Sequence, residues 1–201
     1  MRLKRCILSV IGWTFLSVAA IGYSQVVPAA RATNLPLAVG AGYSDFNADW
    51  DNGRIDGGTV WINYYPAIIP RYLKGLGLDI EARDLSYNKT TAGLQGYKQD
   101  TAGGGAIYSW HHFQNFRPYA KGLMEYGSFD FNVGAPYYHH DTRSLDVMGA
   151  GVDIHVIRHF WARADYEYQI WQPLFGDPHN LTPNGFTFGF LYDFRPPHPE
   201  R

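Results

Sequence analysis

The chain has 201 residues, and its 17 basic and 18 acidic residues give a formal net charge of −1 at pH 7. This length suits a single domain, and the lack of a positive excess argues against a nucleic-acid partner, which would require a basic face. The only cysteine, Cys6, lies near the start of the chain, so we expect no disulfides or thiol chemistry in the remainder.

Residues 1–24 have the organisation of a secretory signal peptide. Three basic residues precede an apolar run over residues 6–20, which is about as long as a signal-peptide core and short for a membrane-spanning helix. We expect cleavage before Gln25, with Ala20 and Ala30 as alternative cut points and an uncleaved anchor as the alternative interpretation. Cleavage would remove basic residues only and leave a more acidic mature chain.

Residues 35–194 alternate between apolar and polar side chains in eight segments, which is the pattern of β-strands. Most segments have roughly 9–13 residues, enough for a tilted strand to cross a bilayer. Residues 25–34 are expected to be a flexible lead-in. Residues 195–201 contain three prolines and are expected to form a short periplasmic tail whose removal has little effect. The predicted strands are Leu35–Ser44, Gly57–Tyr65, Gly75–Tyr87, Thr101–Trp110, Arg117–Phe129, Leu145–Val156, Phe160–Trp171 and Gly185–Phe194.

The predicted connections alternate in length. Every second connection is long, as outer-membrane barrels have long external loops and short periplasmic turns. The long ones are Asp45–Asp56, Asn88–Asp100, Asn132–Thr142 and Gln172–Asn184. The short ones are His111–Phe116 and Ile157–His159, and Pro66–Lys74 is intermediate. This alternation predicts an antiparallel up-and-down arrangement.

The two faces of the predicted strands differ in polarity, most clearly in the seventh strand. Tyr166 and Tyr168 share one face, which we expect to meet lipid, whereas Arg163 and Gln169 share the other. An arginine should therefore be tolerated better at Gln169 than at Tyr168. We interpret the charges on the polar faces as ion pairs that fill a narrow lumen, rather than as a paired-carboxylate active site. The predicted lumen charge network is Glu81, Arg83, Lys121, Glu125, Asp153, Arg163, Asp165 and Glu167, with Asp153 and Glu167 as candidate partners of Arg163.

The last predicted strand reads G-F-T-F-G-F-L-Y-D-F, so every second residue of it is aromatic. Its residues Thr187, Gly189, Tyr192 and Phe194 fit the pattern polar, any, Gly, any, any, hydrophobic, any, aromatic. In this the chain resembles the small eight-stranded outer-membrane β-barrels of the OmpA/OmpX type. The resemblance implies that these four residues are an assembly signal read by the β-barrel assembly machinery. Family members often end at the terminal Phe, whereas this chain continues to Arg201.

Two other groups of residues could bind metal. Asp45, Asn47, Asp49 and Asp51 are spaced oxygen ligands before a glycine, as in calcium loops. The EF-hand spacing fails, because Trp50 occupies the glycine position counted from Asp45, and a solvated acidic turn is the alternative interpretation. Histidines are adjacent at His111-His112 and His139-His140, where neighbouring strand side chains point apart, so we interpret both pairs as surface residues.

A catalytic role would require a serine near a histidine and an acid, as in lipid A-modifying barrels. No His-x-Ser pair or nucleophile elbow occurs at Ser44, Ser86, Ser109, Ser128 or Ser144. We therefore expect an all-β, eight-stranded antiparallel up-and-down transmembrane β-barrel in the cell outer membrane, without catalysis, cofactor or bound metal. Its expected role is structural or surface-interacting, its partners are outer-membrane lipid and the assembly machinery, and its surface ligand is undefined. The alternatives are a lipid A-modifying enzyme, a narrow pore and a soluble lipocalin-like barrel with its apolar face inside.

Overall fold

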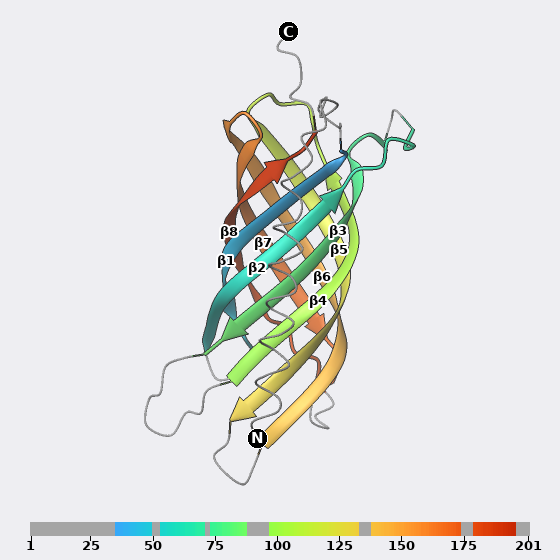
Figure 1. Cartoon of the computed structure of the whole chain (residues 1–201). Helices are drawn as coiled ribbons and strands as arrows, with labels where there is room; N and C mark the ends of the chain where they lie inside the picture. The colour runs from blue at the N-terminus through green and yellow to red at the C-terminus, as the bar shows by residue number, and fades with distance from the viewer. Residues whose placement is uncertain are drawn as a thin grey trace, which may run out of the picture. The chain divides into compact units, whose positions relative to one another are not determined.

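The computed structural model describes residues 35–49, 53–70, 73–87, 97–132, 138–173 and 179–195. Eight antiparallel strands follow one another around a closed barrel, and β1 pairs with β8 to complete it (Figure 1). The predicted fold class is confirmed. The strands are β1 (Leu37–Asn47), β2 (Arg54–Tyr64), β3 (Leu76–Ser86), β4 (Tyr97–Ser109), β5 (Phe116–Asn132), β6 (Tyr138–Ile157), β7 (Phe160–Trp171) and β8 (Asn184–Asp193).

The described residues contain no helix that is long and apolar enough to cross a membrane. The predicted signal peptide, the lead-in 25–34 and the tail residues 196–201 lie outside the described residues.

The barrel has two different ends. We call the end that holds Leu37 and Asp193 the turn end, and the opposite end, where β5 is joined to β6, the loop end. In Figure 1 the turn end is uppermost. The turn end contains the β2–β3, β4–β5 and β6–β7 connections, and the other four connections belong to the loop end.

Strands β5 and β6 reach farther toward the loop end than the sequence pattern predicts. They contain 17 and 20 residues and remain paired as far as Asn132 and Tyr138. The predicted loop over 132–142 was therefore wrong in large part, and His139 and His140 belong to β6. Alternation of polarity identifies a strand only where one face meets water and the other meets an apolar environment, so the pattern does not detect a strand that extends beyond the membrane.

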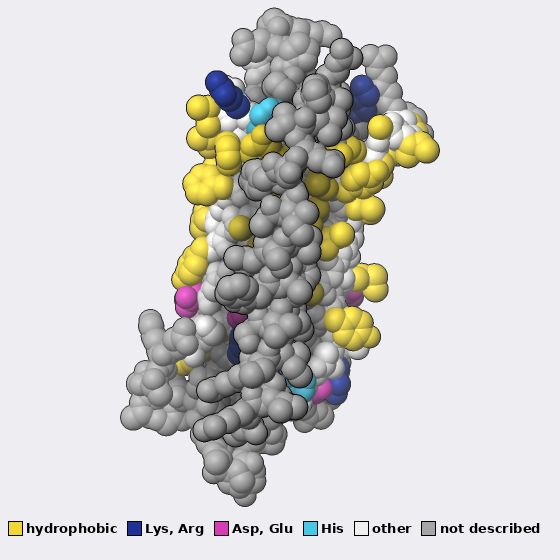
Figure 2. All heavy atoms as spheres, viewed as in Figure 1, with side chains coloured by type: hydrophobic (Ala, Val, Ile, Leu, Met, Phe, Trp, Pro, Cys, Tyr) yellow, Lys and Arg dark blue, Asp and Glu magenta, His cyan; other side chains and the backbone are white. Residues whose placement is uncertain are grey.

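Polar and apolar side chains are divided between the two faces of the wall as predicted. Side chains that face outward include Met124, Tyr168 and Phe188, all exposed, whereas Lys121, Arg163 and Glu167 are buried inside. In Figure 2 hydrophobic side chains lie along both flanks of the described wall, and Lys and Arg side chains lie near its upper and lower ends. A lipocalin-like barrel has the reverse arrangement, so that alternative was wrong.

Glycines make room for large side chains inside the barrel. A Cβ on Gly40 would overlap the Trp61 ring, and a Cβ on Gly149 would lie 2.9 Å from Cε of Lys121. These close approaches require glycine, since real Cβ atoms do not come so near a neighbouring atom. The interior is therefore packed with side chains and leaves the central charges enclosed.

Candidate functional site

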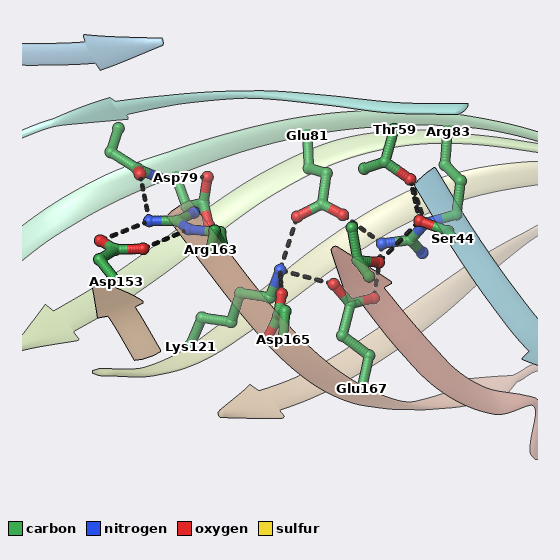
Figure 3. A network of polar contacts seen from close by, with 12 residues as sticks. Ser44, Thr59, Asp79, Glu81, Arg83, Lys121, Asp153, Arg163, Asp165 and Glu167 are labelled. Atoms are coloured by element: carbon green, nitrogen blue, oxygen red, sulfur yellow. Dashed lines mark hydrogen bonds and ion pairs between the residues drawn. The ribbon is translucent and has the colours of Figure 1, made fainter. Parts of the chain in front are cut away.

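The centre of the lumen is organised around the ammonium group of Lys121 on β5. Its Nζ lies 2.7 Å from Oε2 of Glu81 on β3. It lies 2.5 Å from Oδ2 of Asp165 and 2.5 Å from Oε1 of Glu167, both on β7. Figure 3 shows the three carboxylates converging on this one cation from opposite walls. Lys121 therefore links two strands that are not neighbours in the sheet.

Arg83 on β3 extends this cluster toward the loop end. Its Nη2 contacts Oε1 of Glu81 and lies 2.6 Å from Oε2 of Glu167. Its Nε donates to Oγ1 of Thr59 at 3.2 Å. The carboxylate of Glu125 is also buried in this layer, within electrostatic reach of Arg83. The acids of this layer outnumber its two bases.

A second ion pair lies nearer the turn end. Arg163 on β7 donates through Nε and Nη2 to both oxygens of Asp153, at 2.7 and 3.1 Å. Its Nη2 also donates to Oδ1 of Asn63, and Nδ2 of Asn63 donates to Oδ1 of Asp79 at 2.7 Å. Of the two partners predicted for Arg163, Asp153 is the one it contacts, whereas Glu167 contacts Arg83 and Lys121.

The turn end is closed by a residue that the sequence assigned to the tail. Arg195, just after β8, donates through Nε and Nη2 to the two oxygens of Asp193, at 2.8 and 2.7 Å. Oδ2 of Asp193 also accepts a 2.6 Å hydrogen bond from Nη1 of Arg117. The Arg195 guanidinium lies over the Tyr65 ring, 4.0 Å from its centroid. Sequence reasoning missed this residue because its proline-rich context resembles an unattached tail.

The pKa values at this end follow from the same contacts. Burial raises the pKa of the Tyr65 phenol, although the nearby Arg195 charge opposes that change. Burial lowers the pKa of Arg195, but its hydrogen bonds to Asp193 and the nearby negative charges of Asp193 and Asp153 together outweigh this effect and raise the pKa overall. Both groups are therefore held in their ordinary forms, neutral phenol and charged guanidinium.

The loop-end half of the lumen is apolar. A cluster of buried side chains fills it, comprising Phe46, Ala48, Ile55, Leu85, Leu123, Phe129, Leu145, Val147 and Trp171. Buried polar side chains of this half include Gln99 and Gln169, and Oε1 of Gln169 accepts hydrogen bonds from Nε2 of Gln99 and Nε1 of Trp171, both at 2.9 Å. Arginine at Gln169 would break these two hydrogen bonds and place a charge beside the apolar cluster, so we now expect it to be poorly tolerated there.

The predicted calcium ligands do not converge. Asp45 pairs with Arg54 at 2.9 Å, and Asp49 accepts hydrogen bonds from the backbone and hydroxyl of Thr182. Asn47 lies at the end of β1 and accepts a long bond from the Asp49 amide, and Asp51 is outside the described residues. In the described part of the chain, the acids close enough to share a cation are Glu81, Asp165 and Glu167, and the ammonium of Lys121 already contacts all three.

The four residues of the predicted assembly signal lie on or beside β8. Thr187 faces inward and shares a hydrogen bond of 2.6 Å with Ser44, and Gly189 has β1 backbone close against it. Tyr192 lies on the outer face with its ring against that of Phe194. Phe194 is one residue beyond β8, but its amide still donates to the carbonyl of Leu37 at 2.9 Å.

Comparison with known proteins adds the following. A sequence model of the family described as outer membrane protein beta-barrel domain matches residues 15–194. No curated protein sequence matches the chain. The barrel is similar in structure to Neisserial surface protein A, with 13% identity over 78% of this chain and 95% of that chain and a TM-score of 0.61. It is also similar to Ail, the attachment invasion locus protein of Yersinia pestis, with 15% identity over 78% and 96% of the two chains and a TM-score of 0.53. At these identities the similarity concerns the fold.

Proposed function

The chain belongs to the outer membrane protein β-barrel family and lies in the cell outer membrane, and from this premise we propose that it acts at the cell surface through its loop end. In this orientation the short connections face the periplasm and the loop end faces outward. The β5–β6 hairpin is the proposed contact element, and the filled lumen serves as a rigid support for it.

The projection of this hairpin carries the proposal. β6 pairs with β5 as far as Tyr138, but with β7 only as far as Leu145. Between these limits, no described strand pairs with the β7-facing side of β6, although Gln172 donates to the Ser144 carbonyl. The Ser144 carbonyl faces this side, and backbone groups two residues apart on a strand face the same way, so the Thr142 amide, which donates to Oδ1 of Asp141, faces it too. Such an edge can accept an added strand from a partner.

An adhesion assay tests the proposal. Ail is named for attachment and invasion, and one of its structures holds the heparin analogue sucrose octasulfate, which makes adhesion the first activity to measure. Cells that display this barrel should adhere to mammalian monolayers or immobilised heparin more than cells with the gene deleted. Thr142→Pro should reduce adhesion, because proline removes the outward amide without disturbing the β5 ladder.

Thr142→Ala is the matched control, since it changes the side chain and keeps the amide. Equal adhesion of wild-type and deleted cells would contradict the surface role. Deletion of the gene could instead make cells sensitive to detergent. If expression of Thr142→Pro in the deleted strain then restored resistance as fully as the wild-type protein, the role would be structural.

The enzyme and pore alternatives have their own assays. The packed layers of the lumen favour a barrel without an open channel, so we expect no conductance steps in single-channel recordings. We expect lipid A from expressing cells to keep its acylation pattern in mass spectrometry. A changed acylation pattern in expressing cells that is absent from cells with the gene deleted would favour the enzyme.

We also propose that the assembly machinery recognises β8. Phe194→Ala should lower outer-membrane yield in cells strongly while leaving spontaneous folding into detergent micelles nearly normal, because recognition precedes closure. Equal losses in both measurements would make Phe194 a packing residue only.

A further inference from the structure

The outer face of the barrel changes from apolar to acidic at a defined position. On each of the strands β1 to β6, the outward-facing residues are apolar or uncharged over most of the wall. Toward the loop end, the first charged residue on this outer face is an aspartate in every one of the six strands. These residues are Asp45, Asp56, Asp84, Asp100, Asp130 and Asp146. They mark the boundary between the apolar wall and the wet loop end.

Five of the six boundary aspartates have a side-chain partner. Arg54 contacts Asp45, and Lys98 contacts both Asp84 and Asp100. The hydroxyl of Tyr43 donates to Asp56, and His140 contacts Asp130. Asp146 on β6 differs from them, because no described residue forms an ion pair or a side-chain hydrogen bond with it. Its carboxylate is exposed at the membrane boundary without a counter-charge from the described chain.

A groove in the apolar wall begins beside this carboxylate. It has a volume of about 370 Å³ and is lined mainly by Gly104, Gly122, Met124, Met148, Ile170 and Asp146. Gly104, Met124, Asp146 and Ile170 lie opposite one another across four consecutive strands. The groove exists because Gly122 has no side chain, and a Cβ there would meet nothing within 4 Å. Its lining is apolar except for Asp146 at the rim, so it suits a molecule with an apolar chain and a polar head.

We propose that this groove binds one acyl chain of lipid A and that Asp146 holds the lipid phosphate through a bridging divalent cation. Lipid must cover this face, because the chain lies in the outer membrane and the groove is on the apolar side of the aspartate boundary. Mg²⁺ is commonly held by one or two carboxylates together with ligand phosphates and water, which matches a single carboxylate. The choice of lipid A rests on the proposed outward orientation of the loop end.

Lipid retention by the purified full-length barrel in detergent tests the site. Native mass spectrometry after addition of lipid A and MgCl2 gives the ratio of lipid-bound to lipid-free protein. Gly122→Leu should lower this ratio about tenfold, because the new side chain occupies the space of several methylenes. Asp146→Asn and addition of EDTA should each lower the ratio to a similar extent in the wild-type groove.

Gly58→Leu is the matched control. Like Gly122, Gly58 is an exposed glycine whose Cβ would meet nothing within 4 Å, but it lies on β2, away from the groove. It should retain lipid A like the wild type, and all variants should keep the heat-modifiable mobility of a folded barrel. Unchanged retention by Gly122→Leu or Asp146→Asn would overturn the site. Equal retention of phosphatidylethanolamine in EDTA would also overturn it, since an ammonium headgroup would then be the ligand. Dimers that vanish with Gly122→Leu would assign the groove to a second copy.

Discussion

The loop-end and turn-end halves of the lumen are built from the same eight strands, but apolar packing dominates the first and buried ion pairs dominate the second. The loop-end half contains an apolar cluster with Phe129 and Trp171 in ring contact, 4.6 Å between centroids. The central and turn-end layers contain ion pairs centred on Lys121, Arg163 and Asp193, together with two smaller apolar clusters around Trp61 and Tyr65. Apolar burial is non-directional and adjusts to small changes of shape. Buried ions require each partner, because removing one leaves an uncompensated charge in a low-dielectric interior.

Replacement of Lys121 by methionine should have the largest effect. It keeps the unbranched chain up to Cε but removes the ammonium, which leaves Glu81, Asp165 and Glu167 without their shared cation and should cost about 3–5 kcal/mol of unfolding free energy. Urea unfolding in lipid vesicles measures this. Lys98→Met, which breaks an exposed pair, should cost no more than about 1 kcal/mol. Similar values for the two variants would mean that the central charges are solvated rather than buried.

Arginine at Gln169 should be almost as damaging as Lys121→Met. The charge would enter the apolar half and break the contacts of Gln169 to Gln99 and Trp171, so we expect a loss of about 3–5 kcal/mol. Tyr168→Arg, on the lipid face of the same strand, should cost about 2–4 kcal/mol. Folding yields in vesicles and urea midpoints give both values. A mild effect at Gln169 would show that the two halves do not differ in the way we describe.

Loss of Arg195 should weaken the turn end. Arg195→Ala removes two charge-assisted bonds to Asp193, and we expect it to cost about 1.5–3 kcal/mol. Truncation after Arg195 should leave stability unchanged, whereas truncation after Phe194 should reproduce the loss. Hydrogen exchange near β1 and β8 would locate the effect. If both truncations behave like the full chain, Arg195 belongs to the tail, as the sequence pattern predicts.

Leu85→Met should have the smallest effect. It conserves volume within the apolar cluster, so the cost should remain below about 1.5 kcal/mol. Glu167→Gln is equally close in shape but removes a charge that contacts Arg83 and Lys121, and it should cost more. Parallel urea titrations compare the two directly. The reverse order would break the distinction between the apolar and the ionic half.

The sequence by itself determined which face of each strand points where. Period-2 alternation places Tyr168 outside and Glu167 inside without reference to any other strand, since successive side chains of a strand point to opposite faces. The aromatic series of β8 identified the lipid-facing wall in the same way, and the eight strands with their order followed from counting such segments. These are local properties, and local pattern was sufficient to predict them.

Only the tertiary structure decided which residues meet. Glu81 and Glu167 are on opposite walls, and their joint contact with Lys121 depends on the register around the closed barrel. The same register separates the apolar layer from the ionic layers and brings Arg195 into contact with Asp193. It also leaves Asp146 at the rim of the groove without a partner among the described residues. The alternation of polarity along a single strand does not determine how far neighbouring strands are shifted relative to one another. Closure fixes that stagger, and with it the height at which every inward side chain finds its partner.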